Sequence, residues 1–596
     1  MSNNGGNITT LLHLILQVTT VHQKYLQTLT DIVHAASQDR SINTLIYTTY
    51  EHHDVPAPLH SLQSEHILTA LAKRLPTQPL IHFDHTPPVE ELAQRFNKDI
   101  LTIAKLNQQA ELDERLLKTL WQRLLRNTQT RLILLFDDLA SEMYVANLMK
   151  ICVKHRAFHV IALQPRMTVT AGNYWCLRIF PKEETFKCRF ATDHSNIFPK
   201  PLANMHGHPI RLLQFSWYPQ IYYYTPKVGG PAQLSGFVGR GLAEYARYYN
   251  ATIAPTRSYQ NSVIKRSDSV QLLDNDTIDL TSSTPFYTQF LDAGLPVIYY
   301  YSELVLMVPM EQPLPKATFY YNIVQETVAV LFCLTSILYT IVWQLVFRWE
   351  HKRQLTITAD IMNFSIFIGL LGLPFDGAKC KTFIQKIMLF TISIAGVIIG
   401  TAYGAYLGSF IVDAPIASPV QTIDDLLERG IKVAGSMKYL IWISNTKRYR
   451  KYANNFTIFE NYSAYHLKRD ELDTRYAFLV TDMWPLYEEQ QKYFTRPLFR
   501  LSNICLGARY PMVLALQRNS IHREAMHKHV LYLSEAGLID YWQRHIFVEF
   551  LDMGWLVLED RNKREPIEPM RLEDLRLVLM EMFGLLILCV ICFIFE

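Results

Sequence analysis

Long runs without a charged residue restrict what this chain of 596 residues can fold into. Val328–Phe347 and Ile387–Val412 contain 20 and 26 residues without a charge, and the 19 residues of Leu577–Phe595 carry only Glu581. About 20 apolar residues in a helix cross the hydrocarbon core of a bilayer. The sequence therefore predicts transmembrane helices at 326–348, 383–412 and 576–596, although its apolar content of 49% is ordinary.

A fourth apolar segment, 361–375, is too short to span a bilayer and contains Gly369, Gly372 and Pro374. Non-helical backbone persists at membrane depth only where protein buries it or where it lines water. We therefore interpret residues 349–382 as a cytoplasmic connection that includes a re-entrant loop.

Basic residues around this connection set the predicted orientation. Three follow the first span and three precede the second: Arg348, Lys352, Arg353, Lys379, Lys381 and Lys386. The positive-inside rule assigns them to the cytoplasm, so residues 1–325 and 413–575 are expected outside the cell, in a multi-pass plasma-membrane protein. Basic residues from Arg561 to Arg576 oppose this orientation, but long translocated domains obey the rule poorly.

The predicted outer regions alternate between strand and helix patterns. Residues 1–194 contain short apolar runs such as RLILLFDDL between helical stretches such as DERLLKTLWQRLLRN, which is typical of a mostly parallel α/β domain. After the second span, TIDDLLERG predicts a helix with Thr422 as N-cap and Gly430 as its stop. Neither 195–325 nor 413–575 has a complete set of strands, so we expect both to form one bilobed α/β domain interrupted by the membrane segments.

Sequons also favour an exterior location, whereas the cysteines add little. N-glycosylation sequons occur in the predicted exterior at Asn7, Asn250, Asn275, Asn455 and Asn461. Cys152, Cys176 and Cys188 allow one disulfide with one thiol to spare. The N-terminal stretch MSNNGGNITTLLHLILQV is either a weak signal peptide or the start of a chain that lacks an upstream segment.

Composition and motifs argue against several function classes. A net charge of +4 does not indicate a nucleic-acid partner. The cysteines lack the spacing of metal ligands, and Gly236, Gly239 and Gly241 do not match a nucleotide-binding fingerprint. No nucleophile, base and orienting group stand together. We expect no metal, no cofactor and no enzymatic activity.

Three motifs resemble those of ionotropic glutamate receptors. AYGAYLGSFI at 402–411 is similar to their gate signature, SPVQTIDDLLERGIKVAG to the segment after it, and RYAFLVTD at 475–482 to a later strand. The resemblance covers residues 195–596 and includes the order of span, re-entrant loop, span and final span. NMHGHPIR near Asn204 and SEAGLIDYW near Ser534 further resemble the divergent insect ionotropic receptors, a chemosensory branch.

The resemblance implies that the second span lines a pore and forms its gate. Small residues recur there at every fourth position: Gly396, Gly400, Gly404 and Gly408. This spacing lets helix backbones approach closely, where four subunits meet in the family or in ordinary packing of membrane helices. The turn of the pore loop, where relatives carry polar side chains, aligns with Leu370, Leu371 and Gly372.

Ligand-binding positions of the family also have counterparts in this chain. They align with Ser282, with Tyr287 or Thr288, and with Thr481 and its neighbour Asp482. The family's carboxylate-binding arginine is missing, because no arginine occurs between positions 266 and 348. Neither tyrosine nor threonine can replace its bidentate contact with a carboxylate. We therefore expect a small, neutral or weakly polar ligand rather than glutamate.

These features predict a subunit of a ligand-gated, non-selective cation channel that acts as a chemosensory receptor for taste or smell. Leucines at the aperture offer a passing ion no polar side chain. We therefore expect a heterotetramer with co-receptor subunits of the same family. The alternative is a membrane-anchored ligand-binding subunit that does not itself conduct ions.

Overall fold

The computed structural model describes residues 5–50, 64–83, 99–124, 129–190, 197–215, 218–227, 229–259, 266–281, 284–285, 296–315, 326–351, 364–374, 382–436, 447–459, 462–560 and 571–595. The chain divides into two compact units. Unit 1 contains residues 1–305, 479–493 and 505–559, and unit 2 contains residues 306–478, 494–504 and 560–596. Unit 1 therefore combines chain that precedes the long apolar helices with chain that follows them.

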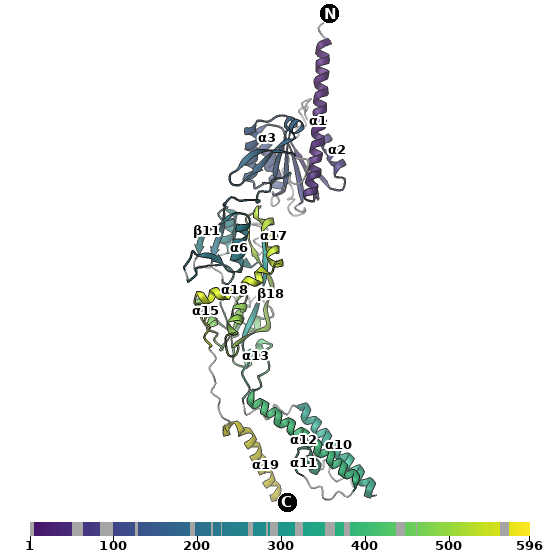
Figure 1. Cartoon of the computed structure of the whole chain (residues 1–596), viewed down its shortest axis with the longest axis vertical. Helices are drawn as coiled ribbons and strands as arrows, with labels where there is room; N and C mark the ends of the chain where they lie inside the picture. Colours follow the sequence, from purple (N-terminus) through teal and green to yellow (C-terminus); the bar gives the residue numbers. More distant parts are fainter. Residues whose placement is uncertain are drawn as a thin grey trace. The chain divides into compact units, whose positions relative to one another are not determined.

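Unit 1 begins with a seven-stranded sheet that has the strand order β2-β1-β3-β4-β5-β6-β7 (Figure 1). The pairs from β2 to β5 are parallel, and the last two pairs, at the β7 edge, are antiparallel. The strands are β1 (Thr44–Thr49), β2 (Leu80–Phe83), β3 (Ile100–Leu106), β4 (Arg131–Phe136), β5 (Val160–Leu163), β6 (Asn173–Arg178) and β7 (Glu184–Arg189). The helices are α1 (Gly5–Asp39), α2 (Ser64–Arg74), α3 (Ala110–Leu124), α4 (Glu142–Lys154) and α5 (Pro165–Ala171). The alternation expected for residues 1–194 is thus observed.

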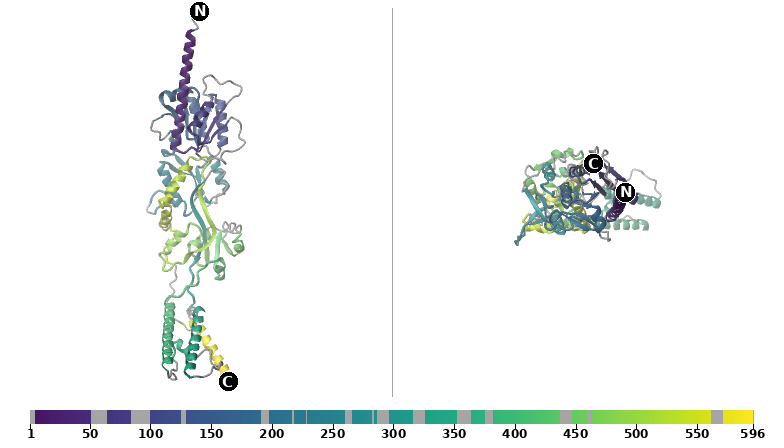
Figure 2. Two further views of the ribbon diagram at one scale, coloured as in Figure 1. Left: turned by 90° about the vertical axis from the view of Figure 1, so that its right-hand side faces the viewer. Right: turned by 90° about the horizontal axis from the view of Figure 1, so that it is seen from above.

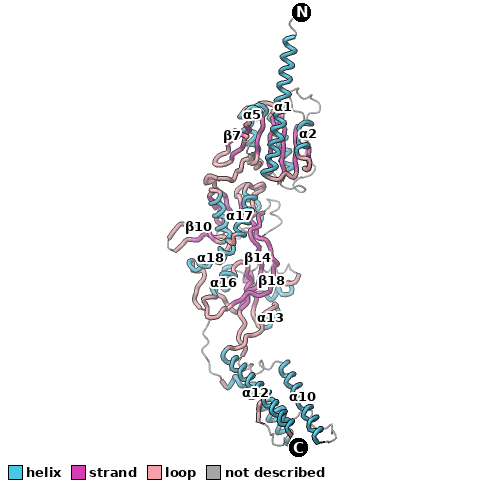
Figure 3. The backbone as a smooth tube through the Cα atoms, turned by 45° about the vertical axis from the view of Figure 1, so that its right-hand side comes forward, coloured by secondary structure: helices cyan, strands magenta, loops and turns pink. Residues whose placement is uncertain are grey.

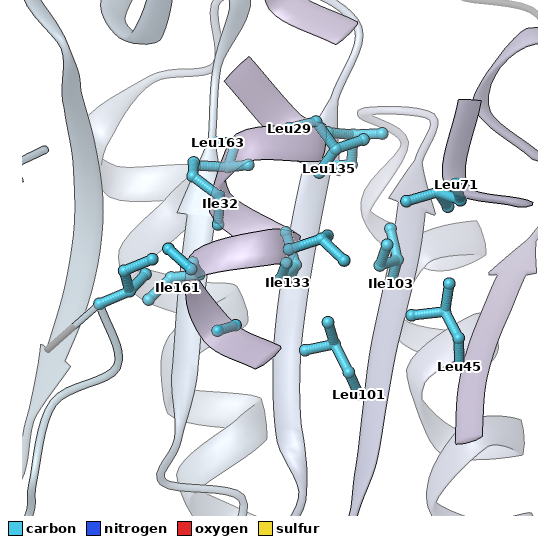
Figure 4. Close-up of a cluster of buried hydrophobic side chains, with 14 of the residues drawn as sticks. Leu29, Ile32, Leu45, Leu71, Leu101, Ile103, Ile133, Leu135, Ile161 and Leu163 are labelled. Atoms are coloured by element: carbon cyan, nitrogen blue, oxygen red, sulfur yellow. The ribbon is translucent and has the colours of Figure 1, made fainter. Parts of the chain in front are cut away.

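Helices cover both faces of this sheet, because successive side chains of a strand point to opposite faces. Leu101 and Ile103 of β3 join a core cluster with Leu29 and Ile32 of α1, as Figure 4 shows. The intervening positions of the strands pack with α3 and α4 in a second cluster. Residues 5–18 of the stretch considered as a signal peptide form the first part of α1, and residues from Tyr25 onwards in this helix belong to the core.

The segments before and after the long apolar helices share one six-stranded sheet with the order β13-β18-β14-β17-β15-β16. Its strands are β13 (Thr284–Pro285), β14 (Val297–Pro309), β15 (Lys432–Ser436), β16 (Phe456–Phe459), β17 (Tyr476–Val480) and β18 (Phe499–Leu514). The long strands β14 and β18 are neighbours in this sheet (Figure 3). The sheet thus combines strands from both segments.

Unit 1 also contains a parallel three-stranded sheet, β11-β8-β12, and the hairpin β10-β9. The strands are β8 (Pro209–Phe215), β9 (Tyr222–Tyr224), β10 (Gln233–Ser235), β11 (Thr252–Tyr259) and β12 (Leu280–Thr281). The helices are α6 (Phe237–Tyr248), α7 (Arg266–Asp274), α16 (Trp484–Gln491), α17 (His522–Glu535) and α18 (Leu538–Asp552).

Unit 2 contains α13 (Ile423–Glu428), η3 (Arg450–Asn455), α15 (Tyr462–Asp470) and η4 (Leu572–Leu575). The N-terminus of α13 is capped as predicted: the Thr422 hydroxyl accepts a hydrogen bond from the Asp425 amide at 3.2 Å. Gly430 follows the helix with φ +71°, a conformation that side chains disfavour. The predicted start and stop of this helix are therefore confirmed.

The predicted membrane segments of unit 2 are helical. They form α10 (Glu326–His351), α11 (Phe364–Leu370), α12 (Phe383–Val412) and α19 (Arg576–Phe595). Helices α10 and α12 lie side by side (Figure 2). Among the described residues, the stretches Ala329–Val346 and Phe383–Val412 are long and apolar enough to cross a membrane, a criterion that uses length and composition alone.

Candidate functional site

A half-buried carboxylate, Asp482, lies at the centre of a polar cluster in unit 1. It follows β17 and precedes α16, so the end of a strand fixes its backbone. One carboxylate oxygen accepts hydrogen bonds from Gln220 Nε2 at 2.7 Å and from the Tyr300 hydroxyl at 2.8 Å. The other accepts from the Ser302 hydroxyl at 2.8 Å. A carboxylate has about four acceptor positions, so most of its capacity is used inside the protein.

Burial raises the pKa of Asp482, and the hydrogen bonds from Tyr300, Ser302 and Gln220 partly offset this shift. Hydrogen bonds from these neutral donors, rather than a basic side chain, stabilise the ionised form of Asp482. Among the described residues, the buried Gln220 Oε1 has no hydrogen-bond partner. One unused acceptor therefore lies beside the Asp482 carboxylate, and a ligand hydroxyl or amide would reach it only if the cluster opened.

The wall of this cluster is aromatic and closely packed. Tyr300 meets Phe237 edge to face with ring centroids 5.0 Å apart, and the Tyr299 hydroxyl donates to the Phe237 carbonyl at 3.0 Å. The Gln220 carbonyl accepts from the Val238 amide at 2.9 Å, at the start of α6. These contacts connect the Asp482 cluster to the α6 N-terminus.

The predicted ligand-binding residues are only partly described. Asp482 is the centre of the cluster, and Thr481 is half-buried next to it. Ser282, Tyr287 and Thr288 lie outside the described residues. On either side of Ser282, the chain is fixed by β12 and β13.

Sequence reasoning missed the partners of Asp482. Gln220, Tyr300 and Ser302 are separated from Asp482 by 262, 182 and 180 positions. Tyr300 and Ser302 do share one strand face, because they are two residues apart in β14. That spacing was the only local signal for them, and Gln220 had none.

A second polar cluster in unit 2 joins the two segments that lead into α10 and α12. Arg500 forms an ion pair with Glu311, whose side chain is only 5% exposed. Glu311 also accepts from the Val420 amide at 2.9 Å, and Arg500 donates to the Val420 carbonyl at 3.1 Å. The Leu314 amide donates to the Pro415 carbonyl at 2.9 Å. The linker 310–315, before α10, is thus bonded to the linker 413–421, after α12.

Hydrogen bonds from Arg500 and Val420 lower the pKa of Glu311 to about 2, against the opposing effect of burial. Glu311 is therefore charged at neutral pH, and its ion pair with Arg500 is charge-assisted. The sequence had given no signal for this pair, because its members lie 189 positions apart.

The predicted pore residues lie around the short helix α11. Gly396 of α12 faces the turn after α11: a Cβ atom there would lie 2.1 Å from the Gly369 carbonyl oxygen. Gly372 has φ +76° in this turn. Leu370 is buried with Ile366 and Ile392, whereas Leu371 is 44% exposed. Of the two leucines expected at the aperture, only Leu371 has an exposed side chain.

Gly396, Gly400, Gly404 and Gly408 form a stripe along α12, and the last three of these glycines have a different environment from Gly396. Within the described residues, no atom lies within 4 Å of a Cβ built at Gly400, Gly404 or Gly408. Contacts within the same chain therefore explain why a glycine is needed at position 396, but not at the other three positions. The prediction that the other three face neighbouring subunits stays a prediction.

Three of the predicted glycosylation positions, Asn250, Asn275 and Asn455, have exposed side chains, and Asn461 lies outside the described residues. Cys176 and Cys188 form a disulfide, and Cys152 remains a buried free thiol. The expected single disulfide is therefore present. Within the described ranges, no three His, Cys, Asp or Glu side chains are grouped so that they could hold a metal ion.

No protein-family model matches the chain, and no curated protein matches it. The resemblance to ionotropic receptors consequently rests on the motifs quoted above.

Proposed function

We propose that this chain is a subunit of a ligand-gated, non-selective cation channel that acts as a chemosensory receptor in the plasma membrane. The observation that carries the proposal is the bonded pair of linkers. Glu311 and Arg500 tie the segment before α10 to the segment after α12. A rearrangement of β14, which ends two residues before Glu311, and of β18, which contains Arg500, would act on both helices at once.

The ligand in this proposal is a small neutral or weakly polar molecule. Asp482 already accepts three internal hydrogen bonds and has no basic partner among its described contacts. Among the described residues the buried Gln220 Oε1 has no partner, so with the aromatic wall it would suit a hydrogen-bond donor with an apolar body once the cluster opens. Such a ligand drives gating only through its different affinities for the open and closed forms of the domain.

The test is expression in a cell that lacks related receptors, with and without a co-receptor subunit, followed by recording during a scan of candidate tastants and odorants. We expect ligand-evoked cation current from the mixed channel and none from this chain alone. Ligand binding without current in every combination would instead favour the alternative, a membrane-anchored receptor subunit that does not conduct.

A matched pair of variants tests the proposed aperture in the mixed channel. Leu371→Gln adds a polar side chain at the turn and should change ion selectivity. Leu373→Gln alters a similarly exposed leucine, 54% against 44% for Leu371, and should not change it. Equal selectivity of both variants and the parent would show that the aperture is formed elsewhere.

A further inference from the structure

A surface groove of about 530 Å³ in unit 1 is lined by Tyr223, Leu234, Ala243, Ala246, Arg247, Asn250, Ala251 and Ile253. These residues come from the hairpin β9-β10, one face of α6 and the start of β11. The volume lies in the range of about 300–1,000 Å³ found for small-molecule sites. None of the residues belongs to the Asp482 cluster or to the linkers.

The hairpin wall of this groove is held in place from behind. Tyr222 and Ser235 are directly opposite each other in the hairpin, and both hydroxyls donate to the buried Glu549 at 2.6 Å. Because side chains alternate along a strand, Tyr223 and Leu234 point to the other face and line the groove. Glu549 of α18 thus fixes one side of the hairpin and leaves a firm wall on the other.

The groove contains two residues of a glycosylation sequon, Asn250 and Ala251. Asn250 lines it, and Thr252 completes the sequon Asn250-Ala251-Thr252 with an exposed side chain. Asn250 Nδ2 donates to Asn204 Oδ1 at 2.8 Å. This contact uses one of the two protons on the amide nitrogen and leaves the other replaceable by a sugar.

We propose that the groove is the seat of an N-linked glycan on Asn250. The covalent bond to Nδ2 places the first N-acetylglucosamine against the groove walls. The apolar face of the sugar packs on Tyr223 and Leu234, while Arg247 donates to its oxygens. The inference rests on the exterior location in the proposed function, since glycosylation requires it. A seated sugar would bridge the hairpin and α6, and would stabilise both.

The experiment uses the full chain produced in glycosylating cells, with site-resolved mass spectrometry and release of glycans from the native protein. Asn455, which is exposed at the end of η3, is the control sequon. We expect both to be modified, with release from Asn250 about tenfold slower because the groove must first open locally. Tyr223→Ala should leave the Asn250 glycan attached and remove this protection. Asn250→Gln should lower the melting temperature more than Asn455→Gln.

The possible outcomes distinguish the proposed glycan position in the groove from the proposed exterior location of the domain. Modification of Asn455 without modification of Asn250 would overturn the seat and leave the exterior location intact. Equal release rates at both sites would also overturn the seat. Modification of neither site would contradict the exterior location and, with it, the proposed topology.

Discussion

At the scale of single residues, Asp482 combines a half-buried carboxylate with a set of neutral donors. Burying a carboxylate is costly unless hydrogen bonds replace its water shell. Gln220, Tyr300 and Ser302 supply those hydrogen bonds. The same arrangement leaves the buried Gln220 Oε1 without a hydrogen-bond partner among the described residues.

Substitutions at Asp482 should separate its charge from its hydrogen bonds. Asp482→Ala leaves its donors without an acceptor, so we expect the free energy of unfolding to fall by about 3 kcal/mol. Asp482→Asn keeps an oxygen for Gln220 and Tyr300, and Ser302 can reverse to accept, so the loss should be about 1 kcal/mol. The measurement is thermal unfolding of the detergent-solubilised chain, with Glu535→Ala as an exposed control.

Ligand responses add a second readout for these variants. A neutral ligand should still activate a mixed channel that carries Asp482→Asn. Complete loss of the response at normal surface level would mean that the ligand is cationic, against the proposal.

Among the four glycines of the stripe, Gly396 is the one that contacts within the described chain require to be a glycine. Gly396→Ala places a methyl group against the Gly369 carbonyl, where the Cβ distance would be only 2.1 Å. Backbone cannot move aside as a flexible side chain does, so we expect a loss of about 2 kcal/mol and reduced surface expression. Flow cytometry of a surface epitope measures the effect.

Gly404 provides the matched control, since none of the described atoms lies within 4 Å of its Cβ position. Gly404→Val should reach the surface normally. If the α12 helices of neighbouring subunits meet at Gly404, channels that contain the Gly404→Val variant should show altered gating. Unchanged currents would indicate that these glycines serve only the ordinary packing of membrane helices.

At the scale of elements, the two linkers behave as one bonded unit because Glu311 and Arg500 connect them. Arg500→Ala leaves a nearly buried carboxylate without its cation, and we expect about 2 kcal/mol of destabilisation. The same variant should weaken the coupling between ligand binding and channel opening in the mixed channel. An unchanged dose–response curve at unchanged stability would argue against a role for this pair in gating.

The pH dependence of stability should report Glu311 directly. The pKa of Glu311 is about 2 in the folded chain, against an ordinary value of 4.5. As pH falls, Glu311 is protonated in the unfolded chain before it is protonated in the folded chain. The stabilisation of the folded chain by the ionised Glu311 is therefore complete at pH values above 4.5 and is lost as pH falls towards about 2. Glu311→Gln should flatten the decline of melting temperature in that interval. An equally steep decline in the variant would mean that other carboxylates cause it.

At the scale of the whole molecule, the membrane topology is the prediction on which the others depend. Six lysines and arginines around the connection between the first two spans favour its cytoplasmic location. An epitope inserted near Asn455 should be labelled on intact cells, and one inserted at Lys352 only after permeabilisation. Labelling at Lys352 on intact cells would contradict the three-span arrangement.

Local sequence determined the elements of this protein. Apolar runs with at most one charge marked α10, α12 and α19, and short apolar stretches marked β1, β2, β4 and β5 of the N-terminal sheet but not β3, β6 or β7. Thr422 and Gly430 marked both ends of α13. Such features depend on hydrogen bonds and periodicities within a few residues, and these are readable without a partner.

Only the tertiary structure decided which distant residues meet. Asp482 accepts its hydrogen bonds, Glu311 pairs with Arg500, and Gly396 lies against the turn after α11. These contacts form because strands and helices that are far apart in the chain are neighbours in the fold. The sequence of either partner contains no record of that choice, since sheet order and long-range loop closure select it from many pairings of similar local quality. The elements were therefore determined locally, whereas the candidate site, the linker pair and the Asn250 groove were decided by how those elements pack.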